Sequence, residues 1–140
     1  MTQQDLKRFA LFGELVETEL EVLEDLLEES RFDAGQQLFR EGQEADGLWL
    51  VAEGHIRVAT ERTGGLGRLG PGEAFGGLSL VGAGGRALTA VAEEPVRVLR
   101  LSRTAFHRLV EDVPRAGARI LEAVLRDVSS ALRAGLDRLA

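Results

Sequence analysis

Residues 72–91 read Gly-Glu-Ala-Phe-Gly-Gly-Leu-Ser-Leu-Val-Gly-Ala-Gly-Gly-Arg-Ala-Leu-Thr-Ala-Val. Two short apolar segments, Ala74–Phe75 and Ala87–Val91, flank a glycine-rich turn that carries one charge, Arg86. Glycines let the backbone approach a ligand closely and point successive N–H groups into one concavity. An arginine at the rim can meet a phosphate with charge-assisted hydrogen bonds. The stretch indicates an anion-binding cradle; the alternative is a plain turn between strands with a solvated arginine.

The chain length fits one domain, which is long enough to bury about two thirds of the surface that the unfolded chain exposes. The 140 residues include no cysteine, which excludes disulfides and thiolate metal sites, and two histidines, His55 and His107, which we expect at the surface. No apolar run approaches the ~20 residues that span a bilayer, and the first residues do not resemble a signal peptide. We therefore expect a cytoplasmic protein without membrane segment, metal or cofactor.

The charge is unevenly distributed along the chain. The net charge is −6, which argues against free nucleic acid as a partner of the isolated domain. Eight acids and no base occur between Glu14 and Glu29. This acidic segment is either a docking surface for a basic partner or a solvated helix face.

Many short strand-like runs follow Arg31, separated by turn clusters rich in glycine, proline and acids. Runs at such spacing are typical of an antiparallel sandwich or barrel. The expected strands are Gln36–Arg40, Leu48–Ala52, Ile56–Thr60, Leu66–Leu69, Ala74–Phe75, Ala87–Ala92 and Val96–Leu101. Trp49 alternates with apolar neighbours, so we assign it to the core rather than to nucleotide stacking.

Helical periodicity occurs on both sides of the strand region. Residues 3–12 suit a short amphipathic helix, and a second helix is expected from Thr18, with Glu21 completing a capping box. Ser102 can cap a helix that begins at Arg103 and is interrupted at Pro114. A longer helix is then expected from about Pro114 to Leu139.

The last helix carries a wide apolar stripe. Its heptad-like seam is formed by Leu121, Leu125, Val128, Leu132, Gly135 and Leu139. Further apolar residues widen the stripe, so we expect one side to rest on the barrel and the other to meet the same helix of a second chain. The alternative is packing within one chain only. The predicted dimer interface comprises Leu121, Val124, Leu125, Val128 and Leu132.

The glycine-rich stretch resembles the phosphate-binding cassette of cyclic-nucleotide-binding domains, as in catabolite activator proteins and the regulatory subunit of cyclic-AMP-dependent protein kinase. The family pattern is roughly Phe-Gly-Glu-Leu-Ala-Leu, a short loop, then Arg-Ala-Ala-Thr. The matching residues are Phe75, Gly76, Leu78, Ser79 and Leu80 in the first part, and Arg86, Ala87 and Thr89 in the second. Gly77 replaces the family's ribose-binding glutamate, and Leu88 replaces a small residue near the phosphate. Weaker matches extend from about Leu11 to Val110.

This resemblance implies a mainly β fold with flanking helices, a jelly-roll barrel (double-stranded β-helix) with N-terminal helices and a long C-terminal helix. Residues 1–113 would form the β-roll domain and residues 114–140 the dimerisation helix. The implied ligand-binding residues are Phe75, Gly76, Gly77, Leu78, Ser79, Arg86, Ala87, Leu88 and Thr89. Ala87, where other members have threonine, implies cyclic AMP rather than cyclic GMP. Ser129 and Ser130 resemble a hydroxyl pair that reaches the base.

Two functions remain open at this point. One is a regulatory sensor in which a cyclic nucleotide moves the C-terminal helix, whose position a protein partner reads. The other is a degenerate member that binds no nucleotide, because of Gly77, and serves as a dimerisation and protein-docking module. Enzyme signatures such as a nucleophile elbow or a Walker lysine are missing, so we do not expect an enzyme. We expect a stand-alone domain without a helix-turn-helix, which does not read DNA by itself.

Overall fold

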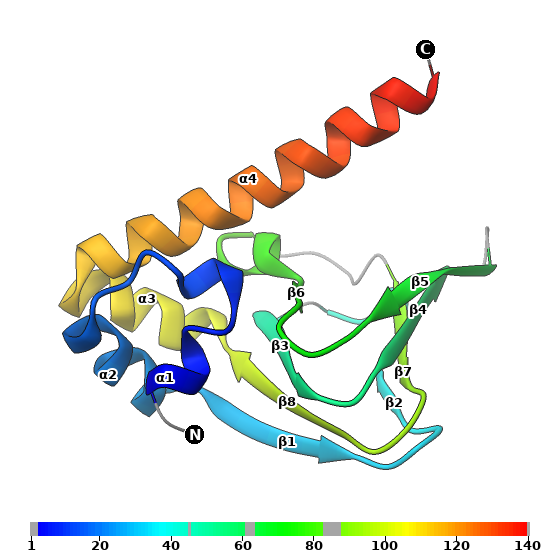
Figure 1. Ribbon diagram of the computed structural model, residues 1–140, viewed down its shortest axis with the longest axis horizontal. Coiled ribbons are helices and arrows are strands. Elements are labelled where there is room, and N and C mark those ends of the chain that lie inside the picture. The colour runs from blue at the N-terminus through cyan, green and yellow to red at the C-terminus, as the bar shows by residue number, and fades with distance from the viewer. Residues whose placement is uncertain (1–2, 45, 61–63, 83–87, 140) are drawn as a thin grey trace.

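Two antiparallel sheets of four strands each form the centre of the fold (Figure 1). The computed structural model describes residues 3–44, 46–60, 64–82 and 88–139. The strands are β1 (Glu28–Phe32), β2 (Gln37–Phe39), β3 (Leu48–Glu53), β4 (Ile56–Thr60), β5 (Gly64–Leu69), β6 (Ala74–Phe75), β7 (Thr89–Ala92) and β8 (Val96–Leu101). One sheet has the order β1-β8-β3-β6 and the other β2-β7-β4-β5. The predicted jelly roll with flanking helices is confirmed.

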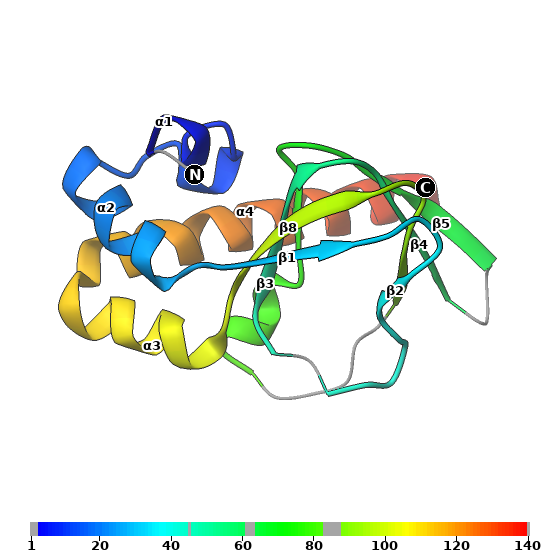
Figure 2. The same ribbon diagram turned by 90° about the horizontal axis from the view of Figure 1, so that it is seen from below.

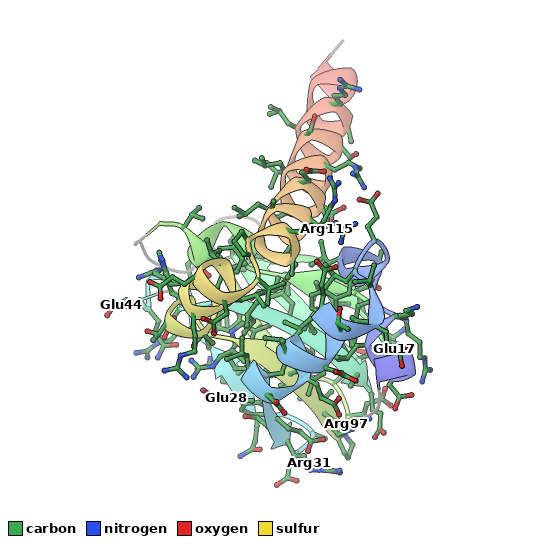
Figure 3. All side chains as sticks on the ribbon, turned by 90° about the vertical axis from the view of Figure 1, so that its left-hand side faces the viewer. Glu17, Glu28, Arg31, Glu44, Arg97 and Arg115 are labelled. Carbon is green, nitrogen blue, oxygen red and sulfur yellow. The ribbon has the colours of Figure 1, made fainter. Side chains whose placement is uncertain are left out.

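Helices α1, α2 and α3 and the start of α4 gather at one end of the roll (Figures 1 and 2). They are α1 (Gln3–Leu6), η1 (Ala10–Phe12), α2 (Glu17–Leu26), η2 (Gly77–Leu80), α3 (Arg103–Asp112) and α4 (Pro114–Leu139), where η marks a 3-10 turn. The long helix α4 begins beside α3, and its C-terminal half extends away from the sheets in Figure 1. Arg115, in the first turn of α4, donates a hydrogen bond to the buried carboxylate of Glu19 in α2 (Figure 3 labels Arg115). This contact joins the N-terminal end of α4 to α2.

Strands β3 and β8 separate two hydrophobic cores. In β3, Leu48 and Leu50 pack with the helices, whereas Trp49 and Val51 face the interior of the roll. This division follows from the strand period of two, which sends successive side chains to opposite faces. Leu99 and Leu101 of β8 likewise join the helical core, and Val96 and Val98 join the roll core. Both strands are therefore mostly apolar, with Arg97 and Arg100 as the charged residues of β8.

Helix starts follow the sequence signals in part. Ser102 caps α3 as predicted, because its Oγ accepts a hydrogen bond from the Ala105 amide at 3.1 Å. The expectation for α2 was wrong in detail: Glu19, not Glu21, is the capping acid, and its Oε1 accepts from the Val16 amide at 2.9 Å. The expected helix over residues 3–12 is divided into α1 and η1, and α4 has the predicted bounds.

The edge strand β1 was not expected, because its residues are charged and lack apolar alternation. The antiparallel ladder with β8 attaches it, and a charge pair adds to this ladder: Arg97 of β8 donates to Glu29 of β1 at 3.0 Å and also to Glu53 of β3 at 2.9 Å. Figure 3 shows Glu28 and Arg97 on this side of the molecule. Partial burial would lower the pKa of Arg97, but the hydrogen bonds to Glu53 and Glu29 outweigh it and raise the pKa overall.

The start of β3 offers a test of close backbone packing. Gly47 has φ +97°, and a Cβ there would lie 2.3 Å from the carbonyl oxygen of Leu101, whereas Gly42, at φ +89°, has open space around it. We expect Gly42→Ala to lower the free energy of unfolding by about 1–2 kcal/mol, the cost of a left-handed L-residue. Gly47→Ala should cost about 1–3 kcal/mol more, because its Cβ overlaps a carbonyl. Urea unfolding compares the two, and equal losses would contradict this account.

Candidate functional site

The glycine-rich stretch forms β6 and, directly after it, the 3-10 turn η2. Trp49 of β3 pairs with Phe75 of β6 in register, and Gly76 then turns the chain with φ +80°, a value that favours glycine. The predicted residues Gly77, Leu78 and Ser79 lie in η2. Arg86 and Ala87 lie outside the described residues. The described chain resumes at Leu88, directly before β7, and Thr89 is the first residue of that strand.

Phe75 anchors this stretch to the roll. Its ring lies 6.2 Å from that of Trp49 in a nearly parallel stack and 5.5 Å from that of Phe39. Trp49 is 9% exposed, which confirms its predicted place in the core. Leu88 also packs against the roll core. The aromatic cluster therefore fixes where the backbone of Gly76 leaves the sheet.

Two predicted hydroxyl groups have partners within the chain. The buried Oγ of Ser79 lies 2.6 Å from the carbonyl oxygen of Gly47 and 2.7 Å from that of Gly76. One hydroxyl has one proton, so these two carbonyls share or exchange it. The Oγ of Thr89 accepts from the Glu41 amide at 2.9 Å and joins the turn after β2 to β7. Both side chains thus hold the stretch in place.

Gly77 touches the long helix. A Cβ at this position would lie 2.7 and 2.8 Å from the two methyl carbons of Val124, which is 5% exposed. A side chain at position 77, a glutamate included, would require Val124 or α4 to shift, because real Cβ atoms do not approach so closely. The sequence indicated that Gly77 replaces an acid and that Val124 belongs to the dimer interface. It gave no signal that the two residues meet.

A cavity of about 190 Å³ lies beside this contact, between η1, β6 and α4. Its lining is mainly apolar, with the carboxylate of Asp127 as its charged member. The lining residues are Leu11, Leu48, Ala74, Phe75, Gly76, Gly77, Val124, Asp127 and Val128. Typical small-molecule pockets measure ~300–1,000 Å³, so the cavity with α4 in this position is small for a nucleotide.

Acidic side chains near the roll turns serve the fold. Glu73 shapes the turn before β6, because its Oε1 accepts a hydrogen bond from the Gly70 amide at 3.0 Å. The pKa of Glu93 is lowered, mainly by the hydrogen bond from Arg68. Slight desolvation raises this pKa by less, and Arg57 also lowers it.

In the described part of the chain, no three His, Asp or Glu side chains are placed to hold a metal ion. None of the described helices is long and apolar enough to cross a membrane.

The predicted dimer seam is partly exposed. Leu125 and Leu132 of α4 are 60% and 64% exposed, and Val128 is 39% exposed at the edge of the cavity. Leu121 packs partly against the helical core, and Val124 contacts its own chain at Gly77. The free apolar surface of α4 therefore begins beyond Val124.

Comparisons with known proteins identify the family. Residues 29–113 match the family model described as cyclic nucleotide-binding domain. The chain is 33% identical over 113 residues to the Cyclic AMP receptor protein of Thermus thermophilus, which covers 78% of this chain. The chain belongs to the cyclic nucleotide-binding domain family. It spans about half the length of that relative, 52%.

Solved structures agree with this assignment. The Catabolite Activator Protein of Thermus thermophilus superposes with a TM-score of 0.80 at 32% identity, covering 92% of this chain and 62% of its own. The N-terminal domain of a transcriptional regulator from Streptomyces coelicolor A3(2) also gives 0.80, at 28% identity, covering 93% of this chain and 94% of its own. The fold thus matches domains from larger regulators and a separately solved domain.

The contact between Gly77 and Val124 can be tested by a double-mutant cycle. Gly77→Ala should lower the free energy of unfolding by about 1–3 kcal/mol, because the new Cβ overlaps the valine methyls. Val124→Ala alone should cost about 1–3 kcal/mol through lost burial. The double variant should lose at least about 1 kcal/mol less than the sum, because alanine at 124 makes room.

A matched control is Gly67→Ala, since nothing lies within 4 Å of a Cβ at Gly67. It should change stability by no more than about 0.5 kcal/mol. Strict additivity in the cycle would show that Gly77 does not determine how closely α4 approaches.

Proposed function

We propose that this chain is a regulatory cyclic-nucleotide sensor, in which a ligand at the glycine-rich stretch changes the position of α4. The observation that carries the proposal is the contact between Gly77 and Val124, because it joins the binding stretch directly to the long helix. A ligand shifts such an equilibrium only when it binds one helix position more tightly than the other. A ligand that moves η2 must change this contact, and the new position of α4 would be read by a protein partner in the cytoplasm.

The proposed ligand is cyclic AMP. Arg86 and the backbone amides around Gly76 to Leu78 would hold the cyclic phosphate, with Ala87 and Thr89 beside it, as the family pattern implies. The name of the similar Cyclic AMP receptor protein and the alanine at position 87 both support cyclic AMP over cyclic GMP. The nucleotide would need more room than the cavity beside Gly77 offers, so binding would require α4 to shift.

A second candidate function also has an observation in its favour. Val124 fills the space that a ribose-binding glutamate would need at position 77, and the adjoining cavity is small. A member of this kind would bind no nucleotide and would act as a dimerisation and protein-docking module. The two candidates make opposite predictions for nucleotide binding.

Calorimetric titration with cyclic AMP and cyclic GMP separates the candidates. We expect cyclic AMP to bind more tightly than cyclic GMP and to raise the unfolding temperature, because a ligand of the folded state stabilises it. Arg86→Gln should weaken binding about ten- to a hundredfold, the effect of losing a charge-assisted hydrogen bond. The control Arg57→Gln removes an exposed arginine that pairs with Glu93 and should leave affinity unchanged.

Neither heat nor a thermal shift at millimolar nucleotide would favour the docking module instead. Recovery of unchanged nucleotide after long incubation is expected, and its turnover would contradict a sensor without enzymatic activity.

We also propose that the exposed apolar surface of α4 pairs with a second copy of the chain. Leu125→Asp together with Leu132→Asp should convert a dimer to a monomer, because each would place a charge in the apolar interface. Val16→Asp is a matched control, since Val16 is 49% exposed on another element. Solution mass by light scattering measures the outcome, and a monomeric wild type would contradict the proposal.

A further inference from the structure

Arg103, the first residue of α3, reaches across to the glycine-rich stretch. Its Nε donates to the carbonyl oxygen of Ser79 at 3.0 Å, and its Nη2 donates to that of Gly82 at 2.5 Å. These carbonyls lie three residues apart, one within η2 and one just after it. One planar guanidinium therefore holds the backbone where the chain leaves η2.

The position of this arginine is unfavourable in local terms. A helix N-terminus carries a partial positive charge, so an arginine in the first turn is disfavoured. Asp46 offsets this, because its Oδ1 accepts from the backbone amide of Arg103 at 3.0 Å. The acid comes from the segment before β3 and not from the helix. The hydrogen bonds from the Arg103 side chain to the backbone at and after η2 explain why an arginine stands at this position.

The contacts together fix the backbone from Gly76 to Gly82 at three points. Arg103 holds the C-terminal end of η2, the Ser79 hydroxyl holds its middle, and Gly77 rests on Val124. A guanidinium fork restricts direction as well as distance, which a single-point donor does not. The orientation of the peptide groups in η2 thus depends on α3.

We infer that Arg103 is a positioning residue for ligand binding: it keeps the backbone of Gly76 to Gly82 in the arrangement that receives the nucleotide, without contacting the nucleotide itself. The inference rests on the proposed sensor function. Without Arg103 the ligand must order this backbone as it binds, and that cost appears as weaker affinity.

The test compares Arg103→Gln and Arg103→Lys with Arg97→Gln. Arg97 is a matched control, because it also makes two side-chain hydrogen bonds, to Glu29 and Glu53, and lies on the sheet away from η2. We expect Arg103→Gln to weaken cyclic AMP binding about ten- to a hundredfold, the effect of losing hydrogen bonds from a charged group. Arg103→Lys keeps the charge without the fork and should fall between glutamine and wild type. Arg97→Gln should bind like wild type.

Amide hydrogen exchange without ligand gives a second readout. Exchange in Ser79 to Gly82 should accelerate in Arg103→Gln and not in Arg97→Gln, because only the former frees η2. Thermal unfolding checks that both glutamine variants fold, and the lysine variant serves if Arg103→Gln does not.

The two proposals fail in different ways. A wild type that binds no nucleotide overturns the sensor function and this inference with it. A wild type that binds, together with an Arg103→Gln affinity equal to that of Arg97→Gln, overturns the inference alone. Full recovery by Arg103→Lys would also overturn it, because charge alone would then account for the effect.

Discussion

The whole structure depends on two strands that are apolar on both faces. Strands β3 and β8 form the wall between the roll core and the helical core, so each contributes to both. The strand period sends alternate side chains to the two cores, and this leaves few positions for polar residues. Because the helices pack on the outer face of this wall, the helical core and the roll core are both built on the same two strands. The same wall borders the glycine-rich stretch, because β3 pairs with β6.

The glycine-rich stretch is held by contacts with elements far away in the sequence. Phe75 fixes it to the aromatic cluster of the roll, Arg103 ties it to α3, and Gly77 rests on α4. Each contact is small, but each connects to a different element. The glycine-rich stretch therefore contacts the roll, α3 and α4 together. In the proposed sensor, these contacts would connect the ligand site to the long helix.

The sequence predicts most of the architecture but less of the site. Local signals were sufficient for the Ser102 cap, the bounds of α4 and most strands, because capping and periodicity act over a few residues. They failed at β1, which pairs with the distant strand β8 and has charged residues in place of apolar alternation. The family match located the glycine-rich stretch. The contacts of Gly77 and Arg103 could not be anticipated, because each joins residues more than twenty positions apart and neither leaves a local pattern.

The stack of Trp49 on Phe75 has a consequence for observation. The protein contains one tryptophan, and no described residue lies within hydrogen-bond distance of its buried indole nitrogen. Its emission therefore comes from a single, largely buried ring that stacks on Phe75, the last residue before Gly76. Any rearrangement that shifts the ring of Phe75 changes the surroundings of this one fluorophore. The intrinsic tryptophan fluorescence of the protein therefore reports on the conformation of the glycine-rich stretch.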